Sequence, residues 1–363
     1  MNETICSHCG CVLEEGEGTL FHEEVYCEDC LQELTILCSH CGQRLYRHDN
    51  EGNRDTPLCG RCYSRYYVSC ERCGLLILQE DAYYESDDDD TPYCYHCHMD
   101  NQTIHSYHYK PEPIFYGTGP AYFGVELEVD GAGEDFRNAR RVLEAANTEE
   151  EDHVYCKHDG SLTDGFEIVT HPMSLDYHCT QMPWDNILST LNSMGYKSHN
   201  TSTCGLHCHY SREALGDTLE EQEDVIARIL YFFEKHWNEL LRFSRRTQEQ
   251  IERWASRYGY QEVPKDILKK AKGGYGRYAC VNITNPSTIE FRIFRGTLKL
   301  NTIIATLQLI DRICKVAISL SDSELKSLSW SGFVSSCTEP ELVQYLKERR
   351  LYVNEPILAE AEV

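Results

Sequence analysis

The cysteines constrain the fold of this chain most, because twelve of them form six Cys-x-x-Cys pairs within the first 100 residues. The first, third and fifth pairs begin at residues 6, 38 and 70, a period of 32 residues, and 17, 17 and 20 residues separate the two pairs of each repeat. Four thiolates from two such pairs form the closed tetrahedral shell of a structural zinc ion. The spacing therefore predicts three zinc sites with the ligands Cys6, Cys9, Cys27, Cys30, Cys38, Cys41, Cys59, Cys62, Cys70, Cys73, Cys94 and Cys97.

The residues around these pairs support the same interpretation. A glycine follows each first pair and permits the tight turn of a zinc knuckle, at Gly10, Gly42 and Gly74. Such modules bury little apolar surface, so metal binding would supply much of their folding free energy. The repeats resemble small treble-clef or LIM-type zinc modules. Nearby side chains that we expect to be bystanders are His8, Cys11, His40, His96 and His98.

Two questions about the cysteines stay open at this point. In the simplest arrangement, two consecutive pairs share each zinc ion. An interleaved arrangement of the pairs would also be compatible with the even spacing. A disulfide framework is the rival interpretation of six pairs. The recurrent spacing and an N-terminus without the features of a secretory signal argue against it.

The charge of the chain limits its partners. A net charge of −25 opposes nonspecific binding to nucleic acid or to an anionic membrane. Residues 1–110 hold 7 Lys and Arg against 21 Asp and Glu, so the zinc modules are expected to contact protein rather than nucleic acid. No apolar run reaches the ~18–20 residues of a membrane span. We therefore expect a soluble, cytoplasmic protein whose oligomeric state the sequence leaves open.

Three later segments alternate polar and apolar residues with the period of a β-strand. The segments are Tyr122–Asp130 (YFGVELEVD), Leu206–Tyr210 (LHCHY) and Thr288–Phe294 (TIEFRIF). Their polar faces carry Glu126, Glu128, Asp130, His207, His209, Glu290 and Arg292. If the strands join one sheet, these side chains converge on a surface that suits divalent cations and phosphates. For any one segment alone, a solvated sheet face is the simpler interpretation.

The intervening segments predict further elements of the same region. A strand at Gly165–Thr170 would place Glu167 on the face opposite Phe166 and Ile168. The basic, glycine-rich stretch Lys272–Arg277 could cover phosphates or form an ordinary hairpin loop. Helical patterns cover Asp135–Ala146, Met182–Met194, Leu219–Tyr258, Leu300–Leu320 and Glu341–Arg350.

These motifs carry a family resemblance. FGVELEVD, DGSL-x3-GFEIVT-x-P, CGLHCHYS and IEFRIFRGTL occur in this order across about residues 122–320. They resemble the amidoligases of the carboxylate–amine ligase superfamily, which shares its core with glutamine synthetase and glutamate–cysteine ligase. The resemblance implies an α+β fold, in which a curved, mainly antiparallel sheet with packed helices binds ATP and two or three Mg²⁺ or Mn²⁺ ions.

The resemblance also implies roles for single residues. The implied metal ligands are Glu126, Glu128, Glu167, His207 and Glu290. His207 would share one ion with Glu126 and Glu290, His209 would lie close to the nucleotide phosphates, and Arg292 would stabilise the transferring phosphoryl group. Asp159, in the DGS motif, would act near the amine substrate. Looser candidates for phosphate or substrate carboxylate contacts are Lys272, Arg277 and Arg295.

The expected function is ATP-dependent formation of an amide or peptide bond through an acyl phosphate, with a peptide or protein substrate recruited by the zinc modules. Two alternatives stay open. The chain could be a zinc-module interaction scaffold with an inactive ligase-like domain, or the same site could catalyse metal-dependent phosphoryl transfer or hydrolysis. A Cys/His metal or thiol site at Cys204 and Cys208, beside the histidine strand, is a weaker idea than buried packing.

The predicted organisation has four regions. Three zinc modules occupy residues 1–104, at about 1–34, 35–66 and 67–104. A proline-containing linker occupies residues 105–121 and precedes a catalytic domain at 122–340. A C-terminal helix and tail follow at residues 341–363.

Overall fold

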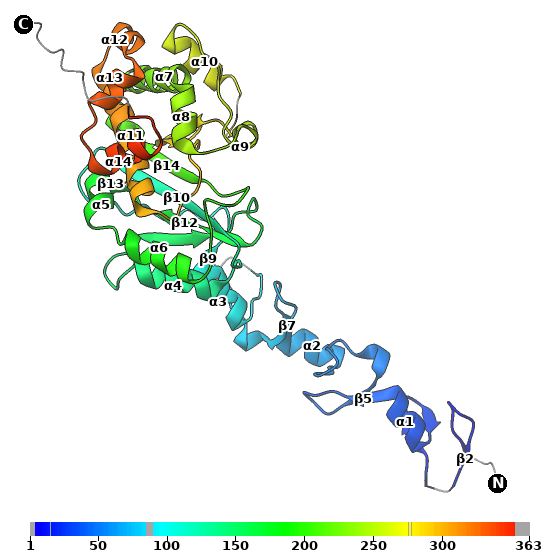
Figure 1. Ribbon diagram of the computed structural model, residues 1–363. Helices are drawn as coiled ribbons and strands as arrows, with labels where there is room; N and C mark the ends of the chain where they lie inside the picture. The colour runs from blue at the N-terminus through cyan, green and yellow to red at the C-terminus, as the bar shows by residue number, and fades with distance from the viewer. Residues whose placement is uncertain (1–3, 15, 85–89, 275, 277, 353–363) are drawn as a thin grey trace, which may run out of the picture. The chain divides into compact units, whose positions relative to one another are not determined.

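The computed structural model describes residues 4–14, 16–84, 90–274, 276 and 278–352 (Figure 1). The chain divides into two compact units, residues 1–102 and residues 103–363. The predicted tail from residue 353 onward and the candidate residue Arg277 lie outside the described residues.

The first unit is built from three short, similar modules. Each has a glycine turn after its first cysteine pair, where the glycine N–H donates to the carbonyl of the first cysteine. Gly10, Gly42 and Gly74 have φ angles of +73°, +71° and +69°, a conformation that favours glycine. A helix begins directly after Cys27, Cys59 and Cys94. The elements are β1 (Thr4–Ile5), β2 (Val12–Leu13), β3 (Thr19–Phe21), β4 (Glu24–Tyr26), α1 (Glu28–Leu34), β5 (Thr35–Leu37), β6 (Arg44–Tyr46), α2 (Gly60–Tyr66), β7 (Tyr67–Ser69), β8 (Leu76–Leu78) and α3 (Tyr95–Thr103).

The second unit is built on an eight-stranded sheet. Its strands are β9 (Ile104–His105), β10 (Tyr122–Asp130), β11 (Val154–Lys157), β12 (Gly165–Thr170), β13 (Met173–Ser174), β14 (Leu206–Ser211), β15 (Val281–Asn282) and β16 (Thr288–Phe291). Their order is β15-β16-β14-β10-β12-β11-β9, and β13 pairs with the start of β10. All these pairings are antiparallel except that of β9 with β11.

Helices pack around this sheet. They are α4 (Phe136–Ala146), α5 (Leu175–Thr180), α6 (Trp184–Ser193), α7 (Leu219–Lys235), α8 (Trp237–Ser244), α9 (Gln248–Trp254), α10 (Pro264–Lys272), α11 (Leu300–Ser319), α12 (Asp322–Ser327), α13 (Trp330–Ser335) and α14 (Pro340–Glu348). Helices α4 and α6 lie side by side, and α11 contacts α5, α7 and α14 (Figure 1). Among the described residues, we find no helix that combines the length and the apolar character of a membrane span.

The apolar face of the sheet forms the main core. Val125, Leu127 and Val129 of β10 are fully buried, and the helices contribute their apolar residues to the same cluster. Burying each such side chain contributes about 1.5–3 kcal/mol. A one-residue slip of β10 would move these residues out of the core and its glutamates in, so packing fixes the register. The core thereby determines which side chains face away from it.

The predicted fold class is confirmed, because a mostly antiparallel sheet with packed helices follows the cysteine-rich region. The predicted bounds of the strands at Tyr122–Asp130 and Gly165–Thr170 agree with β10 and β12. The helical region predicted at Leu219–Tyr258 is divided into α7, α8 and α9. The strand predicted at Thr288–Phe294 ends at Phe291, although the Arg292 N–H still donates to the carbonyl of Cys280 beside β15 over 2.9 Å.

The segment expected to be a linker contacts the second unit. The N–H of Tyr116 donates to Pro172 O over 3.0 Å, and its carbonyl accepts from Ser174 N over 2.9 Å. The Ile114 N–H donates to Nδ1 of His171 over 3.2 Å. Residues from Thr103 onward therefore belong to the compact unit that contains the sheet.

Candidate active site

Strand pairing gathers polar side chains on the sheet face opposite the core. On β10, Glu126 is paired with His207 of β14, and Glu128 is paired with Glu167 of β12. On β16, Glu290 is paired with His209 of β14. These residues come from four strands that are far apart in sequence. The alternation seen in each segment therefore produces one shared surface.

Five of these side chains form two overlapping groups. Oxygen and nitrogen atoms of Glu126, His207 and Glu290 lie within 4.8 Å of one another. The same limit holds for Glu128, Glu167 and His207. His207 belongs to both groups, and the first group is the set predicted to share one ion. Three carboxylates here are almost buried, with Glu128, Glu167 and Glu290 only 3–5% exposed.

Hydrogen bonds hold the two histidines against Glu126. His207 Nδ1 lies 3.3 Å from Glu126 Oε2, and His209 Nε2 lies 3.1 Å from Glu126 Oε1. The other ring nitrogen of His209 lies 2.9 Å from Thr288 Oγ1. Although burial alone would lower the pKa of His209, the Glu126 carboxylate raises it. His209 is therefore oriented beside the candidate metal ligands.

The carboxylates differ in how readily they ionise. Burial alone would raise the pKa of Glu126, but the charge of His209 and hydrogen bonds from both histidines hold it well below its usual range. Burial raises the pKa of Glu128. Burial, reinforced by the charges of Glu126 and Glu128, raises the pKa of Glu167 well above its usual range. A divalent cation bound among these groups would favour the ionised form of each.

Three cationic side chains border the carboxylates. Lys157 Nζ lies 3.9 Å from Glu167 Oε2, and Arg292 Nη1 bonds with Glu290 Oε1. Arg246 is 5% exposed, and burial lowers its pKa to about 10 even though the Glu128 charge opposes this change. The Nε atom of Arg292 is buried without a hydrogen-bond partner in the described part of the chain. It is therefore available to a ligand.

The polar face opens into a cavity of about 420 Å³. Of the predicted site residues, Glu126, Glu128, Asp159, Glu167, His207, His209, Glu290 and Arg292 line it. Asp159 forms a turn in which its Oδ1 accepts from Ser161 N over 2.7 Å. The structure does not bring Lys272 or Arg295 into this cavity. Lys272 pairs with Glu223 of α7, and Arg295 lines a second cavity.

Sequence reasoning missed several lining residues. Lys157 and Asn282 each contact a candidate ligand, since Asn282 Nδ2 donates to Glu290 Oε2 over 2.8 Å. The sequence signal for Lys157 was its alternation with Cys156 on a short strand, which places the two side chains on opposite faces of the sheet. Arg246 follows the end of α8, and only tertiary structure places it at the site. The segment expected to be a linker contributes Tyr107, His108 and Lys110.

Comparison with known proteins identifies the family of the second unit. The sequence profile of the family described as "Putative amidoligase enzyme" matches residues 132–314, which is half of the chain. The chain belongs to this amidoligase family. Strand β10, with two of the candidate ligands, lies just before the matched residues. No curated protein matches the sequence significantly.

Two solved structures are distantly similar to the amidoligase chain. A bifunctional glutathione synthetase from Pasteurella multocida is 13% identical, with a TM-score of 0.32, and the alignment covers 63% of this chain and 46% of that one. A chain from the complex between the prokaryotic ubiquitin-like protein Pup and its ligase PafA is 10% identical, with a TM-score of 0.30 and coverage of 64% and 62%. The amidoligase chain thus spans less than two thirds of either.

In the first unit of the amidoligase, the thiols of two consecutive Cys-x-x-Cys motifs lie close together in each group. The groups with thiols within 4.8 Å of one another are Cys6, Cys9, Cys11 and Cys27; Cys38, Cys41, Cys59 and Cys62; and Cys70, Cys73, Cys94 and Cys97. Thiolates bound to one zinc ion about 2.3 Å away lie about 3.8 Å apart. The second and third cysteines of the predicted sites are separated by 3.8, 3.8 and 3.9 Å. This geometry fits zinc.

The first cysteine group differs from the predicted ligand set. It contains Cys11, expected to be a bystander, in place of the predicted ligand Cys30. The knuckle turn explains this approach, because the Cys6 N–H donates to the carbonyl of Cys11 over 2.9 Å. Cys30 is buried and its side chain contacts those of Cys6, Cys9 and Cys27. Five thiols therefore gather where four are needed.

Proposed function

We propose that this amidoligase is an ATP-dependent ligase that joins a carboxylate to an amine through an acyl phosphate, with a peptide or protein as substrate. One observation carries the proposal. Two groups of potential metal ligands, Glu126/His207/Glu290 and Glu128/Glu167/His207, share a histidine on the floor of one cavity. A carboxylate must be activated before an amine can attack it, and phosphorylation by ATP provides a suitable leaving group.

The donor set suits Mg²⁺ or Mn²⁺ and a nucleotide. Carboxylate oxygens are the preferred ligands of these ions, and imidazole is compatible with Mn²⁺. The four carboxylates, Glu126 included, outnumber the three cationic side chains that border them, and a divalent ion would correct this imbalance. Glu126, Glu128, Glu167, His207 and Glu290 would hold the metal. Bound there, it would neutralise the repulsion between the nucleotide phosphates and an anionic substrate.

The residues of the chain would act in two steps. In the first, a substrate carboxylate oxygen attacks the γ-phosphorus of ATP and ADP leaves, while Arg292 and His209 donate hydrogen bonds to phosphoryl oxygens. In the second, an amine nitrogen attacks the acyl carbon and phosphate leaves. Asp159 would accept the proton that the amine loses. All three side chains line the same cavity.

The zinc modules would recruit the peptide substrate. We propose three structural zinc ions, one for each consecutive pair of motifs, in modules at about residues 1–34, 35–66 and 67–104. The acidic balance of these modules favours protein partners over nucleic acid. A reducing cytoplasm would keep the thiols available for zinc, so we propose that the enzyme works there.

Hydroxylamine tests this function, because it replaces the amine and converts an acyl phosphate to a stable hydroxamate. Zinc-loaded protein, Mg²⁺, ATP and pooled amino acids and peptides should yield ADP and hydroxamate in equal amounts. Glu290→Gln should lower both at least about a hundredfold, because it removes a metal ligand. The exposed Glu213→Gln is the matched control and should behave as wild type.

The same assay separates the alternatives. ADP without hydroxamate, at a rate that Glu290→Gln still lowers, would indicate hydrolysis or another phosphoryl transfer. If wild type releases no ADP with any pool and does not bind Mg²⁺ and ATP, the interaction scaffold becomes the better account.

A further inference from the structure

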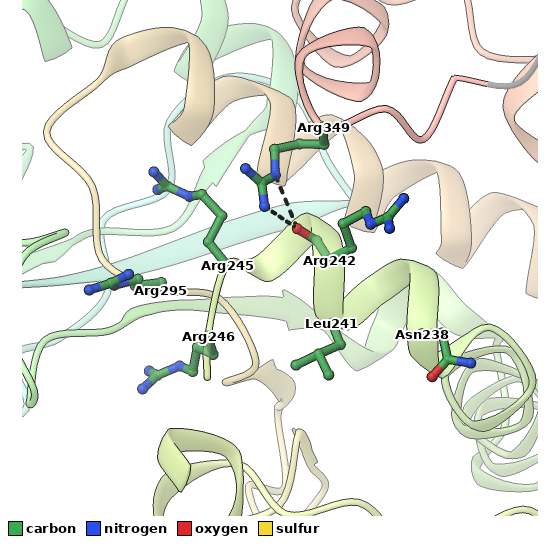
Figure 2. A pocket seen from close by; sticks show the side chains of 7 residues that line it. All are labelled: Asn238, Leu241, Arg242, Arg245, Arg246, Arg295 and Arg349. Carbon is green, nitrogen blue, oxygen red and sulfur yellow. Dashed lines mark hydrogen bonds between the residues drawn. The ribbon is translucent and has the colours of Figure 1, made fainter. Parts of the chain in front are cut away.

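A second cavity of the amidoligase unit, about 560 Å³ in volume, is lined by five arginines with one asparagine and one leucine (Figure 2). The arginines are Arg242, Arg245, Arg246, Arg295 and Arg349. Among the described residues, no acidic side chain lines this cavity. This basic cluster contrasts with the chain's net charge of −25. Five neighbouring guanidinium groups repel one another unless an anion lies among them.

Several of these guanidinium groups have buried donors without partners. Arg246 is 5% exposed, and its Nε and Nη1 atoms have no hydrogen-bond partner among the described residues. The same is true of Arg245 Nε and Nη2 and of Arg295 Nε. A buried donor that lacks a partner destabilises the protein, so such donors in native proteins usually bind ordered water, an ion or a ligand. Guanidinium donors bind carboxylates and phosphates most strongly.

The fold holds the arginines in place from three separate segments. Arg245 ends α8 with a φ of +62°, a conformation that favours glycine. The Arg295 N–H donates to Ser244 O over 3.1 Å, which ties the segment after β16 to the same helix end. Arg349, beyond the family-matched residues, donates to Arg242 O from Nε and Nη2 over 3.1 and 2.9 Å. Figure 2 shows the guanidinium groups around this end of α8.

The arginine cavity adjoins the candidate active site through one residue. Arg246 lines both cavities. A Cβ atom added to Gly205 would come within 2.5 Å of both Arg246 Nη2 and His207 Nε2, so the guanidinium lies beside the shared histidine. An anion bound among the arginines would therefore lie next to the reacting groups.

We infer that the arginine cavity binds an acidic peptide segment, whose neighbouring Asp or Glu carboxylates each pair with a guanidinium group. We further infer that this peptide is the substrate of the ligase, and that step alone rests on the proposed function. The cavity is larger than one phosphate ion requires, and its arginines provide several separate binding points. In the part of the chain that the structure describes, no aromatic side chain on which a nucleic-acid base could stack lines the cavity. An acidic peptide fits these features best.

Binding of a labelled hexaglutamate peptide with blocked ends tests the inference. The full zinc-loaded chain, without nucleotide or Mg²⁺, should bind this peptide and not hexaglutamine. Arg245→Gln should weaken binding at least about tenfold, since it removes a bidentate, charge-assisted pair. Arg245→Lys, which keeps the charge but loses the planar fork, should be intermediate. Arg141→Gln, at an exposed position of α4, is the matched control and should bind as wild type.

Three results would overturn the inference. The first is that hexaglutamate fails to bind wild type. The second is that it binds both Arg245 variants as tightly as wild type. The third is that inorganic phosphate binds as tightly as the peptide at equal ionic strength. Circular dichroism identifies a variant that fails to fold, and the Lys variant then decides the result. A protein that binds hexaglutamate but releases no ADP in the hydroxylamine assay contradicts the proposed ligase activity and supports this binding site.

Discussion

The candidate metal site gathers more carboxylates than cationic side chains among the described residues. Glu128, Glu167 and Glu290 are nearly buried, and together with Glu126 they give four carboxylates against the three cationic side chains that border them in the described part of the chain. Burying charged groups is costly unless they are paired. We interpret this cost as strain that metal binding relieves.

Glu167→Gln tests that interpretation. Because the pKa of Glu167 is raised in the folded protein, stability falls as the pH rises from about 4.3, its unfolded value, through the folded value. In Mg²⁺-free buffer, the variant should match wild type at about pH 4, below the unfolded pKa, and be more stable than wild type at pH 8. Urea unfolding, monitored by tryptophan fluorescence, measures this difference in the free energy of unfolding, since all four tryptophans lie in the second unit.

Mg²⁺ should change this comparison. At pH 8, added Mg²⁺ should stabilise wild type more than Glu167→Gln, because the variant lacks one anionic ligand. A metal-free variant that is less stable than wild type at pH 8 would contradict the interpretation. It would mean that the ion pair with Lys157 outweighs burial and carboxylate repulsion.

Strands β10 and β12 set the geometry of the site through their close pairing. A Cβ atom on Gly165 would lie 1.8 Å from Val129 O and 2.7 Å from Asp130 Cα, both backbone atoms. Gly165→Ala should therefore separate the strands near the Glu128–Glu167 pair and destabilise the second unit by about 2 kcal/mol or more. Urea unfolding measures the loss.

Gly124→Ala is the control for this prediction. A Cβ atom on Gly124, also in β10, would lie 3.6 Å from His209 Cβ, which is an ordinary contact. Its stability should change by less than about 1 kcal/mol. Equal stability of the two alanine variants would mean that the pairing of β10 and β12 does not require glycine at position 165.

The first zinc module allows a test of which cysteine is its fourth zinc ligand. We predict Cys30 as the fourth ligand, because it corresponds to Cys62 and Cys97 in the repeat and is buried as they are, whereas Cys11 is exposed. Cys30→Ser should lower the zinc content from three ions per chain to about two, and Cys11→Ser should keep three. Atomic absorption after gel filtration measures both. The reverse result would assign the ligand role to Cys11.

Periodic patterns predicted these elements well because each pattern depends on local geometry. The alternation in YFGVELEVD predicted both the bounds of β10 and the face on which Glu126 lies. The break between α7 and α8 at His236 could not be predicted in this way. The apolar stripe continues across it, and only the C-terminal cap of α7 reveals it. Tertiary packing overrides the pattern there.

Residues without a pattern were missed for a physical reason. Asn282 belongs to a two-residue strand, and Arg246 follows the end of a helix, so neither has a period to detect. Long-range pairing alone brings them beside Glu290 and His207. The arginine cavity is a further example, since its arginines are separated by up to 107 residues, as Arg242 and Arg349 are.

The whole molecule combines a cysteine-rich unit with a unit that holds all the candidate groups for catalysis. Each unit has its own hydrophobic clusters. We propose that the shared histidine and four carboxylates of the second unit form a site for a divalent ion and ATP.

Calorimetric titration of zinc-loaded protein with ATP, with and without Mg²⁺, tests this claim most directly. We predict Mg²⁺-dependent binding by wild type and by the control Glu213→Gln, and affinity at least about tenfold weaker for Glu290→Gln. If wild type binds no ATP in the presence of Mg²⁺, or if Glu290→Gln binds as wild type does, the claim is contradicted.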